Sequence, residues 1–91
     1  MDATTFMLQN SAFLQAIDSL ALNSELRFCP QGREYQTYMA KRTAIYEKVG
    51  VFIFDERKNV LVGSFSDADI KSGAIVIWCL SMGITSIKIL S

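Results

Sequence analysis

A long uncharged segment near the carboxyl end sets the strongest limit on how this chain folds. No residue from Ser72 to Ile87 is charged, and Lys71 and Lys88 bound the segment. Apolar side chains cover almost the whole circumference of the helix that its first part predicts. Such a helix belongs either in a protein core or in a membrane.

The composition of this segment favours a core. A helix that spans a membrane needs about 20 apolar residues. This segment is shorter and contains serines, a threonine and two glycines. Gly83 divides it into a helix and the start of a strand. We therefore expect no membrane segment here.

One side of this helix can pack on a sheet, but a chain of 91 residues has little material to cover the other side. We expect that side to be closed either by the amino-terminal helix or by a second copy of the chain. Of these two we favour the homodimer, and the residues of its predicted interface are Ile75, Trp78, Cys79 and Met82.

The segments that flank this helix predict strands. The runs VGVFIF and VLVGSF are separated by the polar loop DERKN, which is typical of a β-hairpin. Ser66 and Asp69 then have the spacing of a capping box, and the predicted helix runs over residues 66–82. The final residues, TSIKIL, predict a strand. A strand, a crossover helix and a second strand in one sheet predict a parallel pairing, so we expect a β-α-β closing unit.

Residues 3–21 predict an amphipathic helix, because their apolar positions recur at spacings of three and four. Asn10 is the one polar residue in this stripe, and Asp2 or Thr4 can cap the helix start. Residues 25–29 predict a short strand before the only proline of the chain. The segment 33–48 fits both a helix and a strand. We favour a helix because Gly32 and Gly50 bracket it. The predicted fold class is α+β in a single domain over residues 1–91, with a single small sheet and helices packed on it.

The residue types that most enzymes use are missing or scattered. The chain has no histidine, which excludes catalytic triads and the commonest metal ligand. Its five glycines form no phosphate-binding loop. The acid pairs Asp55–Glu56 and Asp67–Asp69 fit a solvated loop and a helix start. We predict no catalytic residue, no metal site and no cofactor.

The charges balance overall but are unevenly distributed. Nine basic residues offset nine acidic ones, so no overall field attracts nucleic acid. Residues 27–48, however, combine an excess of basic residues with aromatic ones, a mixture that suits an acidic protein surface or a phosphate. The predicted partner-binding residues in this segment are Arg33, Tyr35, Tyr38, Lys41 and Arg42.

These patterns predict a small non-enzymatic protein that acts by occupying a surface on a partner protein, as an inhibitor, an adaptor or an immunity-like protein does. Antagonists encoded by viruses and mobile elements share this physical profile. The two cysteines lack metal-ligand or redox spacing, and no basic leader precedes the first helix, so we expect a cytoplasmic protein. The alternative function is a module that binds nucleic acid or an anionic small molecule through residues 27–48.

Overall fold

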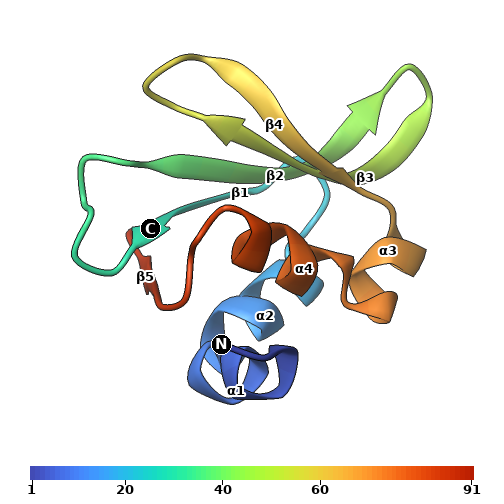
Figure 1. Cartoon of the computed structure of the whole chain (residues 1–91). Helices are drawn as coiled ribbons and strands as arrows, with labels where there is room; N and C mark the ends of the chain where they lie inside the picture. Colours follow the sequence, from blue (N-terminus) through green and yellow to red (C-terminus); the bar gives the residue numbers. More distant parts are fainter.

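Five antiparallel strands form one sheet, and four helices cover one of its faces (Figure 1). This arrangement comes from a computed structural model, which describes residues 1–91, and it confirms the α+β fold class. The strands are β1 (Glu25–Pro30), β2 (Tyr38–Ile45), β3 (Lys48–Asp55), β4 (Val60–Phe65) and β5 (Ile87–Ile89). The helices are α1 (Ala3–Gln9), α2 (Ser11–Asp18), α3 (Asp67–Ser72) and α4 (Ala74–Ser81).

The strand order is β4-β3-β2-β1-β5, and every pairing is antiparallel. The predicted hairpin is confirmed as β3 and β4. The predicted β-α-β unit is wrong, because β5 does not return beside β4. It crosses to the far edge and pairs with β1, where Cys29 lies opposite Lys88.

Residues 33–48 do not form the helix that we favoured. They contain a loop, then β2, then a tight turn into β3, and β2 pairs with β1 on one side and β3 on the other. The alternation of apolar and polar residues that is typical of a strand is not evident in β2, because its core face carries Tyr38, Ala40 and then the charged Arg42. The helix prediction relied on the bracketing glycines, and Gly50 instead lies within β3.

Both predicted helices are interrupted. Residues 3–21 form α1 and α2 with a break at Asn10, and residues 66–82 form α3 and α4 with a break at Gly73, whose φ is 85°. The predicted capping box is present, since Ser66 and Asp69 exchange side-chain to backbone hydrogen bonds. Asp2 caps α1 by accepting the Thr5 N–H at 2.7 Å, which lowers the pKa of the Asp2 carboxyl below its usual value.

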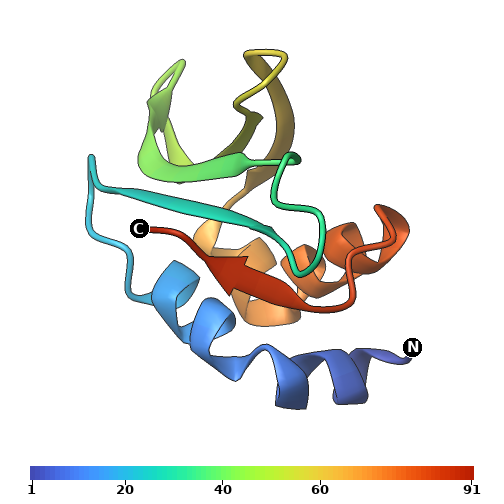
Figure 2. The same ribbon diagram turned by 90° about the vertical axis from the view of Figure 1, so that its left-hand side faces the viewer.

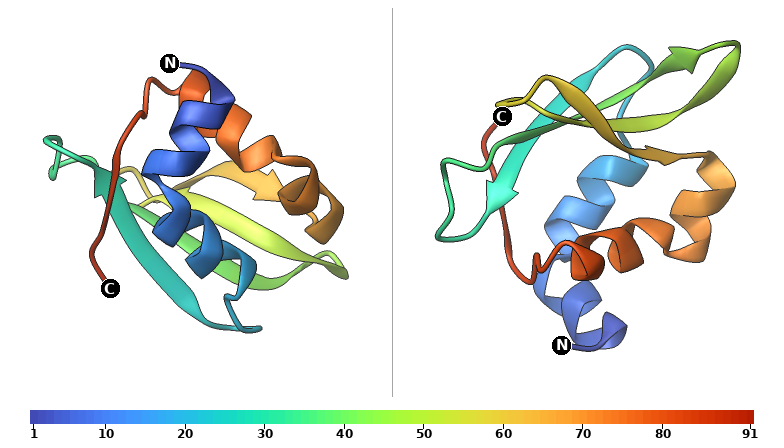
Figure 3. Two further views of the ribbon diagram at one scale, coloured as in Figure 1. Left: turned by 90° about the horizontal axis from the view of Figure 1, so that it is seen from below. Right: turned by 45° about the horizontal axis from the view of Figure 1, so that its top comes forward.

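The core lies between the sheet and the helices. Viewed from below, α1 and α2 cross the sheet beside α3 and α4 (Figure 3). Phe28 lies between Phe13 and Tyr38, with ring centroids 4.8 and 5.5 Å away, and Tyr38 meets Trp78 edge to face. Other core residues are Phe6, Ile17, Val51, Ile53, Ile75, Cys79 and Ile84. The opposite face of the sheet carries no helix, and the β2–β3 and β3–β4 connections rise on that side (Figure 2).

Candidate functional site

Side chains from the helices satisfy backbone groups at both edges of the sheet. At β5, the buried side chain of Asn10 accepts from the Ile87 N–H at 2.9 Å and donates to the Thr85 carbonyl at 3.0 Å. At β4, Val62 has no partner in β3 because a bulge interrupts the register, and the Trp78 indole donates to the Val62 carbonyl at 3.0 Å. These contacts reduce the backbone available for a partner strand. The face of the sheet opposite the helices, which we call the open face, carries no helix (Figure 2).

Two of the residues predicted to bind a partner have internal contacts. Tyr38 is only 2% exposed and packs among the core rings. The Arg42 side chain, 12% exposed, donates to the carbonyls of Leu20 and Ile17 and pairs with Asp67. Arg42 therefore ties the end of the first helical pair to β2 and α3 instead of facing solvent.

The other predicted partner-binding residues lie at two separate places in the fold, one on a loop and one on the sheet. Arg33 donates to the Gly83 carbonyl at 3.0 Å, and Tyr35 is 68% exposed on the same loop. Lys41 lies on the open face of the sheet, opposite Phe52 in the register. The structure thus does not gather the predicted set into one surface.

The predicted homodimer interface lies largely inside the chain. Ile75 and Cys79 are buried in the core. Trp78 packs against Tyr38 and Phe65 with ring centroids 5.8 and 6.3 Å away, and only Met82 of the four is classed as exposed. The amino-terminal helices and the sheet close most of the face on which we expected a second copy, because the break at Asn10 lets α1 contact α4.

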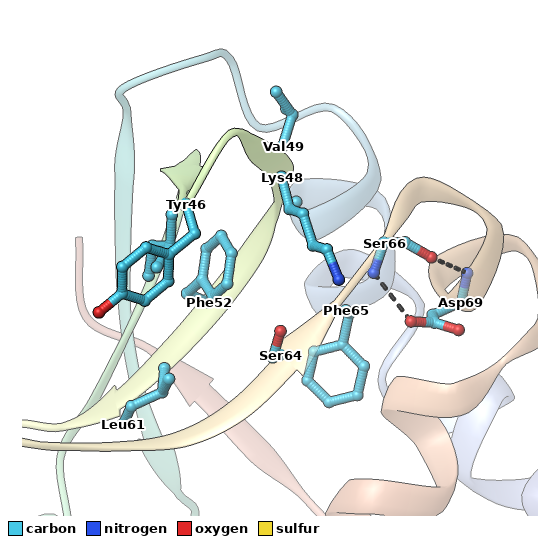
Figure 4. Close-up of a pocket in the computed structure, with 11 residues that line it drawn as sticks. Tyr46, Lys48, Val49, Phe52, Leu61, Ser64, Phe65, Ser66 and Asp69 are labelled. Atoms are coloured by element: carbon cyan, nitrogen blue, oxygen red, sulfur yellow. Dashed lines mark hydrogen bonds between the residues drawn. The ribbon is translucent and has the colours of Figure 1, made fainter.

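A hollow with a volume of about 530 Å³ lies on the open face, beside the β2–β3 turn (Figure 4). Tyr46, Phe52 and Leu61 stand on one side of it, and Lys48 extends from the turn toward Phe65 and Ser66. Asp69 lies near the polar end, where its carboxylate accepts the Ser66 N–H. We call Ile45, Tyr46, Lys48, Phe52, Leu61 and Ser64 the hairpin-tip surface.

The turn beside this hollow has a strained backbone. Tyr46 and Glu47 form the two-residue connection between β2 and β3, and their φ angles are 50° and 67°. Both residues therefore lie in the left-handed region, where Asn and Gly are the usual choices for such a hairpin turn. Tyr46 is also 95% exposed, so packing of its ring does not compensate for the strain.

Unpaired basic side chains also lie on this face. The chain forms three ion pairs, Arg27–Glu56, Arg42–Asp67 and Lys88–Glu34. Neither Lys41 nor Lys48 takes part in them. The hairpin-tip surface thus combines aromatic and aliphatic groups with an accessible ammonium group.

A second, smaller pocket of about 270 Å³ lies at another end of the sheet. It gathers three segments: the loop after β1, the β3–β4 loop and the end of α4. Its lining residues are Tyr35, Gln36, Tyr38, Asp55, Arg57, Lys58 and Met82.

The cysteines and acids give no sign of redox or metal chemistry. Cys29 and Cys79 are buried and unpaired, and burial raises the pKa of the Cys79 thiol to about 12. No group of three or more Cys, Asp or Glu side chains is placed to hold a metal ion. No helix is both long and apolar enough to cross a membrane.

No family model matches the chain, and neither the curated proteins nor the solved structures contain a significant match to it. Any functional argument therefore rests on its own residues. Our sequence reasoning included Tyr46 only as an aromatic residue of the segment 27–48, and it missed Phe52 and Leu61. The signal available was the pair Tyr46–Glu47 between two alternating segments, which reads as a hairpin turn only when β2 is recognised as a strand.

Proposed function

We propose that this protein is a non-enzymatic interaction protein that binds a partner protein through the hairpin-tip surface and acts as an inhibitor or adaptor. The observation that carries this proposal is that Tyr46, although 95% exposed, occupies a strained position at the tip of a hairpin. Non-glycine residues with left-handed backbone angles cost about 1 to 2 kcal/mol each. Strain of this kind clusters at functional sites.

Contacts of the exposed Tyr46 ring do little to offset the free-energy cost of this strain. A side chain that is almost fully in solvent buries little apolar area, so it contributes little to the stability of the isolated chain. Tyrosine is, however, one of the residues that most often dominate binding energy at protein interfaces. A turn that sacrifices stability to display a tyrosine is consistent with a binding role.

The hollow beside Tyr46 supports a contact in which each protein receives a side chain of the other. Tyr46 can enter a pocket of the partner while an apolar side chain of the partner rests against the exposed Leu61, beside the buried Phe52. Lys48 borders the same hollow and has no ion-pair partner, so an acidic residue beside that apolar side chain would complete the contact. The proposed partner therefore presents an apolar segment with an adjacent carboxylate.

Self-association and cellular location are further parts of this proposal. The helices α1 and α4 contact each other, and both carry exposed apolar side chains, among them Leu8 and Ile77. These exposed side chains support a homodimer better than the half-buried Trp78 does. The unpaired buried cysteines are consistent with a reducing compartment such as the cytoplasm. Light scattering on the wild type and on Ile77→Asp tests the dimer, and a wild-type monomer at high micromolar concentration would exclude it.

The decisive experiment replaces the turn by one that relieves its strain. We expect the double variant Tyr46→Asn/Glu47→Gly to unfold at a higher urea concentration than the wild type, because this pair favours the same turn. We also expect it to lose the partner in quantitative affinity capture from the native host. Leu22→Asn is the matched control, since it removes another exposed apolar side chain that lines neither of the two pockets.

A partner that is retained by the double variant, or lost equally by Leu22→Asn, would refute the proposed surface. The purified pair then allows a salt titration. A packed protein contact weakens only modestly as salt rises, whereas binding through phosphates weakens steeply and linearly on a log-log plot.

A further inference from the structure

The smaller pocket at the other end of the sheet suggests a second binding site. We call it the loop pocket, and it shares no residue with the hollow beside Tyr46. Tyr35, Gln36 and Tyr38 come from the segment after β1, and Arg57 and Lys58 come from the β3–β4 loop. Met82 lies at the end of α4. The pocket therefore depends on the tertiary fold and not on one local motif.

Hydrogen bonds between these three segments hold the walls of the loop pocket in place. The Glu56 N–H donates to the Thr37 carbonyl at 3.1 Å, which joins the β3–β4 loop to the segment after β1. Arg33 joins that segment to the residue after Met82 by donating to the Gly83 carbonyl at 3.0 Å. The Gln36 amide and the Tyr38 hydroxyl are also hydrogen-bonded to each other. The pocket is thus formed before any ligand arrives.

The charge in the loop pocket favours an anion. Arg57 and Lys58 both line it, and neither forms an ion pair within the chain. Asp55 is the one carboxylate in the lining, and its Oδ1 already accepts the backbone N–H groups of Arg57 and Lys58 at 3.0 and 3.1 Å. Glu56, next to it, pairs with Arg27. Two basic side chains therefore face one carboxylate that is partly compensated by the backbone.

The remaining walls suit a flat ring. The Tyr35 side chain is 68% exposed, so one face of its ring is open to stacking, and Met82 provides a polarizable thioether. Ligand pockets usually have volumes of about 300 to 1,000 Å³. A volume of about 270 Å³ lies just below this range, which limits the ligand to one ring system and one anionic group.

We propose that the loop pocket binds a phosphate monoester that carries a single flat ring system, with the ring on Tyr35 and the phosphate between Arg57 and Lys58. Arginine offers two parallel donors to a phosphate, and lysine adds a point charge. This chemistry occurs in a free mononucleotide and in a phosphotyrosine side chain. The proposal is independent of the hairpin-tip surface, because no residue is shared.

The test is a titration of the isotope-labelled protein, followed by amide NMR shifts, with phenyl phosphate as the first probe and inorganic phosphate as its comparison. We expect saturable shifts at residues 35–38, 55–58 and 82. We expect phenyl phosphate to bind at least about tenfold more tightly than inorganic phosphate, since stacking of a ring on an aromatic side chain adds binding energy that a bare phosphate cannot gain. Uridine monophosphate and a phosphotyrosine tetrapeptide then distinguish the two sources, and the tighter of them names the source.

Two variants test the assigned residues. Arg57→Gln/Lys58→Gln should weaken the binding of phenyl phosphate at least about tenfold. Tyr35→Ala should lower the affinity for phenyl phosphate to the affinity for inorganic phosphate. Lys41→Gln/Lys71→Gln is the matched control, because it removes one half-exposed and one exposed charge outside the loop pocket and outside the hairpin-tip surface. Urea unfolding of each variant shows whether the fold is retained.

Three results would overturn the proposal. Equal affinity for phenyl phosphate and inorganic phosphate would show a bare anionic contact without a ring site. Shifts centred on the hairpin-tip surface would place binding elsewhere. Unchanged binding in a folded Arg57→Gln/Lys58→Gln variant would exclude these side chains as the phosphate ligands.

Discussion

The side-chain oxygen of Asn10 accepts a hydrogen bond from the backbone N–H of Ile87 at 2.9 Å, across 77 positions of the sequence. The same side chain donates to the carbonyls of Thr85 and Phe6, each at 3.0 Å. One buried amide therefore satisfies the edge of β5 and a carbonyl at the break between α1 and α2. This contact joins the amino-terminal helices to the last strand.

We expect Asn10→Ala to lower the free energy of unfolding by about 2 to 4 kcal/mol, because the partly buried Ile87 N–H and Thr85 carbonyl lose their partner. Urea unfolding measures the loss, and amide hydrogen exchange of Ile87 should accelerate with it. Gln9→Ala, at an exposed position of α1, is the control and should change stability little. A loss below about 1 kcal/mol would contradict the structural role of this amide.

Arg42 provides a second prediction, because its guanidinium joins β2 to carbonyls at the end of α2 and to Asp67. Arg42→Met keeps much of the packing of the side chain but removes these bonds. We expect it to destabilise the fold by about 2 to 3 kcal/mol, since hydrogen bonds from charged groups contribute more than neutral ones. Lys41→Met, the next residue on the opposite face of β2, should be close to neutral in thermal unfolding. Similar losses in the two variants would argue against this role.

Gly63 lies against the only tryptophan of the chain. A Cβ atom at Gly63 would stand 2.9 Å from Cε2 of Phe65 and 3.2 Å from Nε1 of Trp78. We expect Gly63→Ala to displace the indole from the Val62 carbonyl, to shift Trp78 fluorescence to longer wavelength and to cost about 1 to 3 kcal/mol. Ser64→Ala, on the open face, is the control for fluorescence and stability. An unshifted spectrum in Gly63→Ala would show that the ring accommodates the methyl group.

We expect the buried Cys79 thiol to make the protein less stable at alkaline pH. Burial raises its pKa from 9.0 to about 12 in the folded chain. Below pH 9 the thiol is protonated in both states, and its contribution is fully present. Between these values the unfolded chain binds fewer protons, so the free energy of unfolding should fall by at most about 1.4 kcal/mol per pH unit from this group. Urea unfolding at several pH values, compared with Cys79→Ala, isolates this slope. An identical slope in the variant would assign the effect to other groups.

Much of the local structure could be predicted because its signals lie within a few residues. The hairpin follows from two apolar runs around DERKN, and the start of α3 follows from Ser66 and Asp69. The strand β2 was missed because Arg42 occupies a core-facing position that a periodicity argument reserves for apolar residues. No residue near Arg42 in the sequence indicates that the carbonyls of Ile17 and Leu20 accept hydrogen bonds from its guanidinium.

The candidate sites were less predictable than the fold. The segment 27–48 was a reasonable place to seek binding residues, yet Tyr38 is buried and Arg42 is tied to the helices. Exposure depends on which face of a strand packs on the core, and that was unknown while 33–48 remained open to two interpretations. The strain at Tyr46 became visible only when the turn had backbone angles.

The sequence by itself determined the α+β class, the hairpin and the caps of α1 and α3, since propensity and capping act between neighbouring residues. Only the tertiary structure decided that β5 joins β1 and that Trp78 turns inward to Val62. The physical reason is that a buried backbone group must find a hydrogen-bond partner, and here those partners are side chains far away in the sequence.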